Sequence, residues 1–580
     1  MRTITDGSTS FRPTPAAPGT LTAVPHADHA RPVPRPEYVE PVPLAELAGL
    51  LGTPAPHGPL PEVTGITHDS RAVRPGDLYA ALPGARFHGA DFATQAAGLG
   101  AVAVLTDPEG AQRAAATGLP VLAVDNPRAR TGALAVAVYG DPGRDLLLIG
   151  VTGTSGKTTT SYLLEGALRR AAAKDPADPA DPSGAAGEAA ASIGLIGTVE
   201  TRIGAERVKS ERTTPEATEL QGLFAVMRER GVRAVAMEVS SHAIALGRVD
   251  GCRFDVAVFT NLSPEHLDFH PDMEDYYRTK ARLFTPQFAR LGVVNLDDEH
   301  GRRLAAEAGI PVTTYSAEGH PDADWRAADV AIGPLGSTFT ALGPDGTRVA
   351  AAAPLPGPFN VANALAAIAA AAVAGLDPQA AAGGVAAVPG VPGRLERIDV
   401  GQPYLAVVDY AHKPDAVESV LHALRRVTPG RVHAVLGCGG DRDPHKRPRM
   451  GAAVARLADT AVLTSDNPRS EDPLAILAAM LAGAAEVPAH ERGTVLVEED
   501  RAAAIAAAVA RAESGDAVLI AGKGHERGQD IAGVIRPFDD REELRAAIRR
   551  RAERSPTPGT PTPSPAESHS ETEARRGPLQ

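Results

Sequence analysis

The stretch LLLIGVTGTSGKTT, residues 146–159, decides the fold class of this chain. Its first half is a short apolar run, typical of a strand buried on both faces of a parallel sheet. A Gly-rich turn follows, and residues 159–170 then have the composition of a helix. Such a strand, turn and helix would point backbone N–H groups and the positive end of the helix at phosphate oxygens. We therefore predict a P-loop, in which Lys157 reaches the β- and γ-phosphates and the Thr158 hydroxyl binds Mg²⁺. The alternative is a Gly/Thr turn with a chance lysine.

Similar apolar runs recur along the chain and alternate with longer Ala-rich helical stretches. They cover residues 234–239, 256–260, 405–408, 432–436 and 517–521. Runs of this length ending in Gly, Asp or Thr favour parallel strands joined by crossover helices. The predicted fold class is therefore α/β.

Composition excludes several classes of protein. The chain has 580 residues, of which 43% are hydrophobic and 22% charged, as in ordinary globular proteins of three or four domains. A net charge of −13 argues against a dedicated nucleic-acid binder. The two cysteines, Cys252 and Cys438, lie far apart, so neither a disulfide framework nor a zinc cluster is expected, and a reducing compartment fits best.

Compositional bias marks the expected limits of the domains. Residues 1–40 and 552–580, rich in Pro, Ser, Thr and charge, predict disordered tails, and residues 171–191 read as a low-complexity loop insertion. Segments rich in Pro or Gly near 141–144 and 388–393 separate the expected domains 41–143, 144–390 and 391–551. The longest apolar stretch, Val361 to Leu376, is too short to span a membrane, and the first thirty residues lack the pattern of a secretory signal. We therefore expect a cytoplasmic protein with no membrane span.

Polar residues follow two of the predicted strands. Glu238 ends the run AVAME, where a carboxylate beside a P-loop can contact a hard cation; the alternative is a solvent-exposed Glu at the end of a strand. His266 follows the run VAVFT and has either a metal or phosphate role or a capping role at the surface. Both residues are candidates for the same site.

Lysine usage singles out further candidates. Only seven of the 58 basic residues are Lys. A Lys therefore marks positions where a guanidinium does not replace a compact, titratable ammonium. Five of the seven lie in motif-like segments: Lys157, Lys280, Lys413, Lys446 and Lys523.

Ten motifs follow one another along the chain: GTSGKTT (153–159), MEVSSH (237–242), TNLSPEHLDFH (260–270), YYRTK (276–280), GPFNVANALAA (357–367), GRLE (393–396), VVDYAHKPDA (407–416), GCGGDRD (437–443), SDNPRSEDP (465–473) and GKGHE (522–526). In this order they resemble the motifs of the Mur ligases of peptidoglycan precursor synthesis. The resemblance covers roughly residues 60–550 and is closest to the members that act on UDP-N-acetylmuramoyl-L-alanyl-D-glutamate.

The resemblance implies an ATP-dependent amide ligase of three domains. These are an N-terminal UDP-substrate domain, a central P-loop ATPase domain and a C-terminal Rossmann-like domain that binds the amino acid. The D-Glu side-chain carboxylate would attack the γ-phosphate of ATP, and diaminopimelate would then displace phosphate from the acyl phosphate. The implied partners are ATP, Mg²⁺, the UDP-muramoyl dipeptide and diaminopimelate, bound by a monomer.

The resemblance also implies roles for individual residues. Lys157, Glu238, His266 and Lys280 would be catalytic, and Mg²⁺ would be held by Thr158, Glu238, His266 and Lys280, the last as an N6-carboxylysine. The implied ATP contacts are Gly153, Thr154, Ser155, Gly156, Lys157, Thr158, Thr159, Asn360, Asn363, Arg394, Asp409 and His412. Those to the UDP substrate are Ser70, Thr213, Thr214, Ser240 and Arg248, and those to diaminopimelate are Arg442, Asp466, Asn467, Pro468, Arg469, Gly522 and Glu526.

Three alternatives stay open at the level of sequence. The chain could be a lysine-adding relative, but such relatives lack the arginine found here at position 469. It could be a folylpolyglutamate-like ligase of the same superfamily, against which the DNPR and GKGHE motifs argue. It could also be a P-loop scaffold without catalysis, although intact Lys157, Glu238 and Lys280 disfavour that reading.

Overall fold

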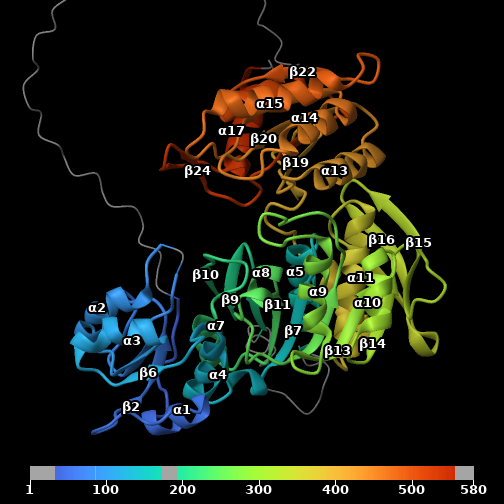
Figure 1. Ribbon diagram of the computed structural model, residues 1–580. Helices are drawn as coiled ribbons and strands as arrows, with labels where there is room; N and C mark the ends of the chain where they lie inside the picture. Colours follow the sequence, from blue (N-terminus) through green and yellow to red (C-terminus); the bar gives the residue numbers. More distant parts are fainter. Residues whose placement is uncertain (1–32, 85, 173–192, 555–580) are drawn as a thin grey trace, which may run out of the picture. The chain divides into compact units, whose positions relative to one another are not determined.

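The computed structural model describes residues 33–84, 86–172 and 193–554, and the rest of the chain is outside the description (Figure 1). The predicted insertion at 171–191 therefore falls outside it except for Ala171 and Ala172, which end a helix. Most of both predicted tails also falls outside. Residues 552–554 belong to the last helix, and Arg35, within the predicted N-terminal tail, donates to both carboxylate oxygens of Asp77 at 2.6 and 2.5 Å.

The first unit is a four-stranded parallel sheet with the strand order β3-β4-β5-β6. Its core packs apolar side chains of the strands against α1 and α4, including Leu78, Leu105 and Leu134. The strands are β3 (Gly65–Thr67), β4 (Asp77–Ala80), β5 (Ala103–Thr106) and β6 (Val121–Ala123), preceded by a short pair, β1 (Val42–Pro43) and β2 (Glu62–Val63). The helices are α1 (Leu44–Leu51), α2 (Ala93–Gly98), α3 (Pro108–Ala114) and α4 (Arg128–Tyr139).

The second unit is an eleven-stranded sheet with the order β10-β9-β8-β11-β7-β12-β13-β14-β15-β16-β17. The strands from β8 to β15 in this order are parallel, whereas β9, β10, β16 and β17 are antiparallel additions at the two ends. The strands are β7 (Leu147–Thr152), β8 (Ile193–Ile196), β9 (Glu200–Ile203), β10 (Glu206–Lys209), β11 (Ala234–Glu238), β12 (Phe254–Phe259), β13 (Ala289–Asn295), β14 (Val312–Ser316), β15 (Trp325–Gly333), β16 (Gly336–Leu342) and β17 (Arg348–Ala353). The helices are α5 (Lys157–Ala172), α7 (Ala217–Glu229), α8 (Ser241–Ala245), α9 (Met273–Ala281), α10 (Glu299–Glu307), α11 (Pro358–Val373) and α12 (Pro378–Ala386).

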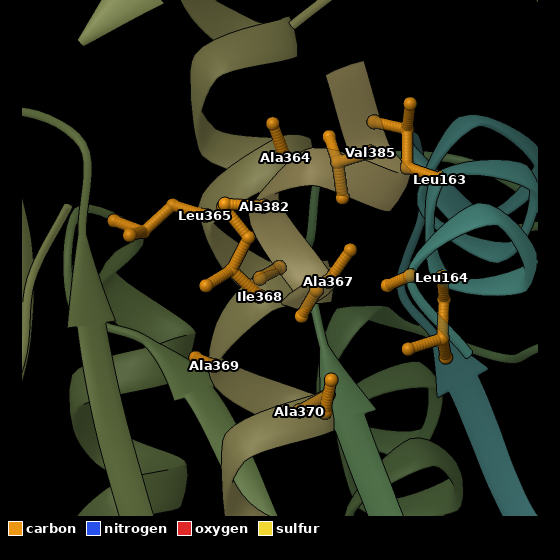
Figure 2. Close-up of a cluster of buried hydrophobic side chains, with 14 of the residues drawn as sticks. Leu163, Leu164, Ala364, Leu365, Ala367, Ile368, Ala369, Ala370, Ala382 and Val385 are labelled. Carbon is orange, nitrogen blue, oxygen red and sulfur yellow. The ribbon is translucent and has the colours of Figure 1, made fainter. Parts of the chain in front are cut away.

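The Ala-rich stretch after Gly357 forms α11, a helix buried in the core of the second unit. A helix that is apolar all round is stable only when covered on most sides. Figure 2 shows Ala367 and Ala370 of this helix on the side of Leu164 of α5, with Leu163 of α5 and Val385 of α12 nearby, whereas Leu365 points away from α5. Across the described ranges, no helix has both the length and the apolar character needed to cross a membrane.

The third unit is a six-stranded sheet with the order β18-β19-β23-β20-β21-β22, parallel except for β18. Helices cover both faces: α13, α14 and α15 enclose one core, and α16 and α17 the other. The strands are β18 (Glu396–Arg397), β19 (Leu405–Asp409), β20 (Val432–Cys438), β21 (Thr460–Ser465), β22 (Thr494–Val497) and β23 (Ala517–Ala521), followed by the hairpin β24 (Gly528–Ile531) and β25 (Val534–Pro537). The helices are α13 (Pro414–Val427), α14 (Lys446–Leu457), α15 (Pro473–Glu486), α16 (Arg501–Arg511) and α17 (Asp540–Arg554).

The predicted α/β class with parallel sheets is confirmed. The three sheets lie inside the expected limits 41–143, 144–390 and 391–551, and we retain these limits as a proposal for the domain boundaries.

A buried ion pair in the third unit gives a first stability prediction. The Arg501 guanidinium donates to both oxygens of Asp540 at 2.7 Å, and both side chains are 0% exposed. We expect Arg501→Met to lower the free energy of unfolding by about 3–5 kcal/mol, because it leaves a buried carboxylate uncompensated. Urea denaturation measures this loss. The double variant Arg501→Met/Asp540→Leu should lose less, and a single variant as stable as the parent would contradict the prediction.

Candidate active site

The P-loop lies between β7 and α5, as predicted. Gly153 and Gly156 have φ values of 146° and 86°, in the region that favours glycine, and a Cβ on Gly153 would approach the Thr260 hydroxyl to 1.9 Å. The end of β12 holds the loop: Asn261 Oδ1 accepts from the Ser155 N–H at 2.9 Å. The loop is therefore fixed by its neighbouring strand.

The P-loop lysine folds back onto the loop. Lys157 Nζ donates to the carbonyl oxygens of Gly153 and Thr154 at 2.8 and 3.0 Å. Burial lowers its pKa. The ammonium is thus held beside the turn where phosphate oxygens would bind.

Two oxygen donors meet beside this loop. The Thr158 hydroxyl donates to Glu238 Oε2 at 3.1 Å, because β11 lies next to β7 in the sheet and Glu238 ends β11. Thr198 donates to the same carboxylate from its backbone N–H (2.8 Å) and its hydroxyl (3.0 Å). Glu238 is buried, and within the described residues no Arg or Lys forms an ion pair with it. A buried carboxylate beside a hydroxyl and without a counter-cation fits a magnesium ion.

Lys280 and His266 both lie against Tyr276. Lys280 is 1% exposed, and its Nζ donates to the Gly153 carbonyl at 3.0 Å and lies 4.7 Å from the Tyr276 ring centre. Burial, and then the charge of Lys157, lower the pKa of Lys280 well below its ordinary value. Two lysines therefore share one carbonyl, and Lys280 is biased toward the neutral amine.

His266 has an unusual backbone for a non-glycine residue, with φ at 58°. Its ring packs edge-on against His242 at 4.7 Å and Tyr276 at 6.1 Å between centres, and burial lowers its pKa to about 4. Thr158 and Glu238 thus form one group, and His266 and Lys280 form a second around Tyr276. Across the described ranges, no three His, Cys, Asp or Glu side chains form a ready-made metal cluster.

Residues from α11 and from the start of the third unit lie around the P-loop. Asn363 Oδ1 accepts from Thr160 at 3.2 Å, and Asn363 Nδ2 donates to Asn360 Oδ1 at 3.2 Å. Arg394 donates to the Thr158 hydroxyl at 3.1 Å.

Asp409 and His412 contact backbone groups of nearby residues in the third unit. Asp409 accepts from the N–H groups of Leu395 and Ala411 at 2.7 Å, and burial raises its pKa. His412 Nδ1 lies 2.7 Å from the Tyr410 carbonyl.

Sequence reasoning missed Glu265 as part of this site. Burial alone would raise the pKa of its carboxyl, but Lys413, His412 and other nearby cations lower it to about 2. Lys413 Nζ lies 3.3 Å from Glu265 Oε2. The scarcity of lysine had marked Lys413, whereas nothing in the sequence paired it with Glu265.

Four of the five residues predicted for the UDP substrate come together. Thr214 donates to the Glu238 carbonyl at 2.9 Å, and its hydroxyl accepts from the Ser240 N–H at 3.2 Å. Arg248 donates to the Thr214 carbonyl at 3.5 Å. Thr213 joins them through Thr198, at 3.0 Å between hydroxyls. Ser70 is bonded elsewhere, with its hydroxyl donating to Gln95 at 3.1 Å.

The residues predicted for the amino acid lie at the carboxyl ends of β20, β21 and β23. Asn467 Nδ2 donates to Glu526 Oε2 at 2.8 Å, and Arg469 Nη1 donates to the Gly440 carbonyl. Gly439 is next to both Arg469 and Arg442. Pro468 follows Asn467, and Gly522 lies beside Asp466, where an added Cβ would be 3.1 Å from Oδ2. In parallel α/β sheets, ligands commonly bind outside the carboxyl ends of the strands.

Sequence profiles of one family match most of the chain. The Mur ligase family catalytic domain matches residues 62–139, the Mur ligase middle domain residues 151–371, and the Mur ligase glutamate ligase domain residues 393–524. The chain belongs to the Mur ligase family, and it is therefore an ATP-dependent amide-bond ligase. The resemblance inferred from the motifs is confirmed.

Individual relatives agree with this assignment. The chain is 74% identical over 515 residues to the UDP-N-acetylmuramoyl-L-alanyl-D-glutamate--2,6-diaminopimelate ligase of Streptomyces avermitilis, covering 89% of this chain and 98% of that protein. A solved structure of an enzyme of the same name superposes with a TM-score of 0.60 at 32% identity, covering 88% of this chain and all of that one. The MurF ligase of Thermotoga maritima in complex with ADP shares the fold, with a TM-score of 0.55 at 19% identity over 85% of this chain and 98% of that one.

Proposed function

We propose that this chain joins diaminopimelate to the D-Glu side-chain carboxylate of UDP-N-acetylmuramoyl-L-alanyl-D-glutamate, in peptidoglycan precursor synthesis. The observation that carries the proposal is the 74% identity to a ligase of that name over 98% of its length. The reaction needs ATP, because a carboxylate and an amine do not condense until the carboxylate oxygen becomes a good leaving group.

The P-loop and its surroundings would bind ATP and Mg²⁺. Backbone N–H groups of residues 153–159 and the Lys157 ammonium would neutralise the phosphates. Thr158 and Glu238 would hold one magnesium ion, which would supply charge neutralisation at the phosphates when bound. Asn360, Asn363, Arg394, Asp409 and His412 would complete the nucleotide site.

Lys280 would act as a carboxylated lysine. A neutral amine can attack CO₂, forming an N–C bond and releasing a proton, and this turns a cation into an anionic carbamate. The lowered pKa of Lys280 supports the first step. The carbamate, together with His266, would supply the second magnesium site.

The chemistry would proceed in two displacements. The D-Glu carboxylate attacks the γ-phosphorus of ATP and gives an acyl phosphate and ADP. The amine of diaminopimelate then attacks the acyl carbon, and the tetrahedral intermediate loses phosphate. The chain's own contribution is to orient the reactants and neutralise their charges: Thr213, Thr214, Ser240 and Arg248 on the dipeptide side, with Lys157 at the phosphates.

Recognition of diaminopimelate would depend on its distal end. The amino acid carries a distal carboxylate that lysine lacks, and the Arg469 guanidinium can bind a carboxylate through two parallel hydrogen bonds. Glu526 would pair with the distal ammonium, and Arg442 would assist at the carboxylate. UDP precursors and ATP are cytoplasmic metabolites, so we also propose that the chain acts in the cytoplasm, as a monomer.

A side-by-side assay of diaminopimelate and lysine with wild type and Arg469→Ala tests the proposal. We expect wild type to release phosphate when the UDP-dipeptide and diaminopimelate are both present, and to use lysine poorly. In Arg469→Ala the KM for diaminopimelate should rise by about 10- to 100-fold, because a charge-assisted pair is lost. Unchanged kinetics would contradict the role of Arg469. Preference for lysine would favour a lysine-adding relative, and absence of any coupled product would favour the scaffold.

A further inference from the structure

Lys523 is a fully buried lysine to which the proposed function assigns no role. Its side chain is 0% exposed. Its Nζ lies 3.0 Å from Asn467 Oδ1, 3.2 Å from Glu526 Oε2 and 3.4 Å from Asp466 Oδ1. A buried ammonium is stable only when its charge and its donors are matched, and these three acceptors match them.

The acceptors come from two loops that do not follow adjacent strands. Asp466 and Asn467 follow β21, whereas Glu526 follows β23, and β20 lies between these two strands in the sheet. Strand pairing therefore does not set the distance between the loops directly. The contacts of Lys523, with the hydrogen bond from Asn467 Nδ2 to Glu526 Oε2 at 2.8 Å, join them.

The hairpin after β23 fixes the other side of the first loop. Gln529 Nε2 donates to the Asp466 carbonyl at 2.8 Å, and the Arg469 N–H donates to the Asp530 carbonyl at 2.9 Å. Arg469 itself has a left-handed backbone, with φ at 52°. The position of its guanidinium thus depends on a loop held between Lys523 and the hairpin.

The charges around Lys523 complement the ammonium and the carboxylate at the distal end of diaminopimelate. Asp466, Glu526 and Lys523 together carry one net negative charge, and the Glu526 side chain is 34% exposed, so that it remains accessible to a ligand. Arg469, on the same loop as Asp466, provides a separate positive charge. An amino acid with both an ammonium and a carboxylate at its distal end would neutralise both.

We propose that Lys523 is a positioning residue that sets the spacing between Glu526 and Arg469, and so selects an amino acid with a distal zwitterion over lysine. The inference rests on the proposed function and deepens it. Lys523 acts through Asn467 and Glu526 and does not itself touch the substrate. Its loss should therefore weaken the use of diaminopimelate more than the use of lysine, which has no distal carboxylate to place.

The test compares Lys523→Met with wild type and with a matched control. Asp516→Asn is that control: Asp516 is also buried, with its Oδ2 3.2 Å from His433 Nε2, but at the opposite, amino edge of the same sheet. Full-length proteins are assayed for the KM of diaminopimelate, lysine, ATP and the UDP-dipeptide, together with their thermal midpoints.

We expect Lys523→Met to raise the KM for diaminopimelate by about 10- to 100-fold and to lower the diaminopimelate-to-lysine ratio of kcat/KM by about 10-fold. The KM values for ATP and the UDP-dipeptide should stay within about 3-fold, and Asp516→Asn should keep the wild-type ratio even if its midpoint falls. Combining Lys523→Met with Glu526→Gln should cost less than the product of the two single effects, because both act on one contact.

An unchanged ratio in Lys523→Met, or an equal rise in the KM of every substrate, would overturn the inference. If Lys523→Met does not fold, Lys523→Gln, which keeps a hydrogen-bond donor, is judged by the same ratio. Wild type that fails to couple diaminopimelate at all would instead contradict the proposed function.

Discussion

Lys280→Ala should reduce ligase turnover by about 10³-fold or more, since it removes the proposed carbamate that would hold the second magnesium ion beside the phosphates. The structure favours this outcome because Lys280 is buried, shares the Gly153 carbonyl with Lys157 and has a lowered pKa. An ordinary structural lysine would keep its proton and would not react with CO₂. Steady-state phosphate release with both substrates measures the loss, and mass spectrometry of wild type should find one added CO₂ at position 280.

Two further variants serve as comparisons for Lys280→Ala. Lys280→Arg should be nearly as inactive as Lys280→Ala, because a guanidinium keeps its proton and forms no carbamate. Lys209→Ala, at an exposed lysine of β10, should retain wild-type turnover. Full activity of Lys280→Ala together with an unmodified side chain in wild type would refute the carbamate.

Six of the buried parallel strands, β7, β11, β12, β19, β20 and β23, were predicted from the sequence because their signal is local. The run at 234–239 became β11 and that at 146–151 became β7, both covered on two faces. The antiparallel strands β9 and β10 at one end, and β16 and β17 at the other, were missed. Their half-exposed residues carry a weaker apolar signal than a strand buried on both faces.

The site was only partly predictable for a related reason. The motifs predicted Thr158 and Glu238 as ligands of the same metal. Their contact in the structure follows from the adjacency of β7 and β11 in the sheet. The partners that hold them, such as Thr198 beside Glu238 and Lys413 beside Glu265, depend on which strand ends meet in space. Sequence order contains no direct signal for such contacts, and the buried pair of Arg501 and Asp540 is a further case.

Glu238→Gln should lower turnover by about 10²- to 10³-fold, because it removes the negative charge proposed to hold magnesium beside the P-loop. The replacement keeps the size of the side chain and one oxygen able to accept from the Thr198 N–H, which Glu238 accepts at 2.8 Å. The loss should therefore reflect charge more than folding. Turnover measured across a magnesium titration should show a half-saturating concentration raised by about 10-fold or more.

Asp255→Asn is the matched control for Glu238→Gln. Asp255 accepts from the Leu148 N–H at 3.0 Å at the amino edge of the same sheet, away from the P-loop end of β7. This variant should keep the wild-type magnesium dependence, even if its stability falls. If Glu238→Gln has the same magnesium dependence as Asp255→Asn, Glu238 only supports the hydroxyls of Thr158 and Thr198. The metal must then be held by other groups.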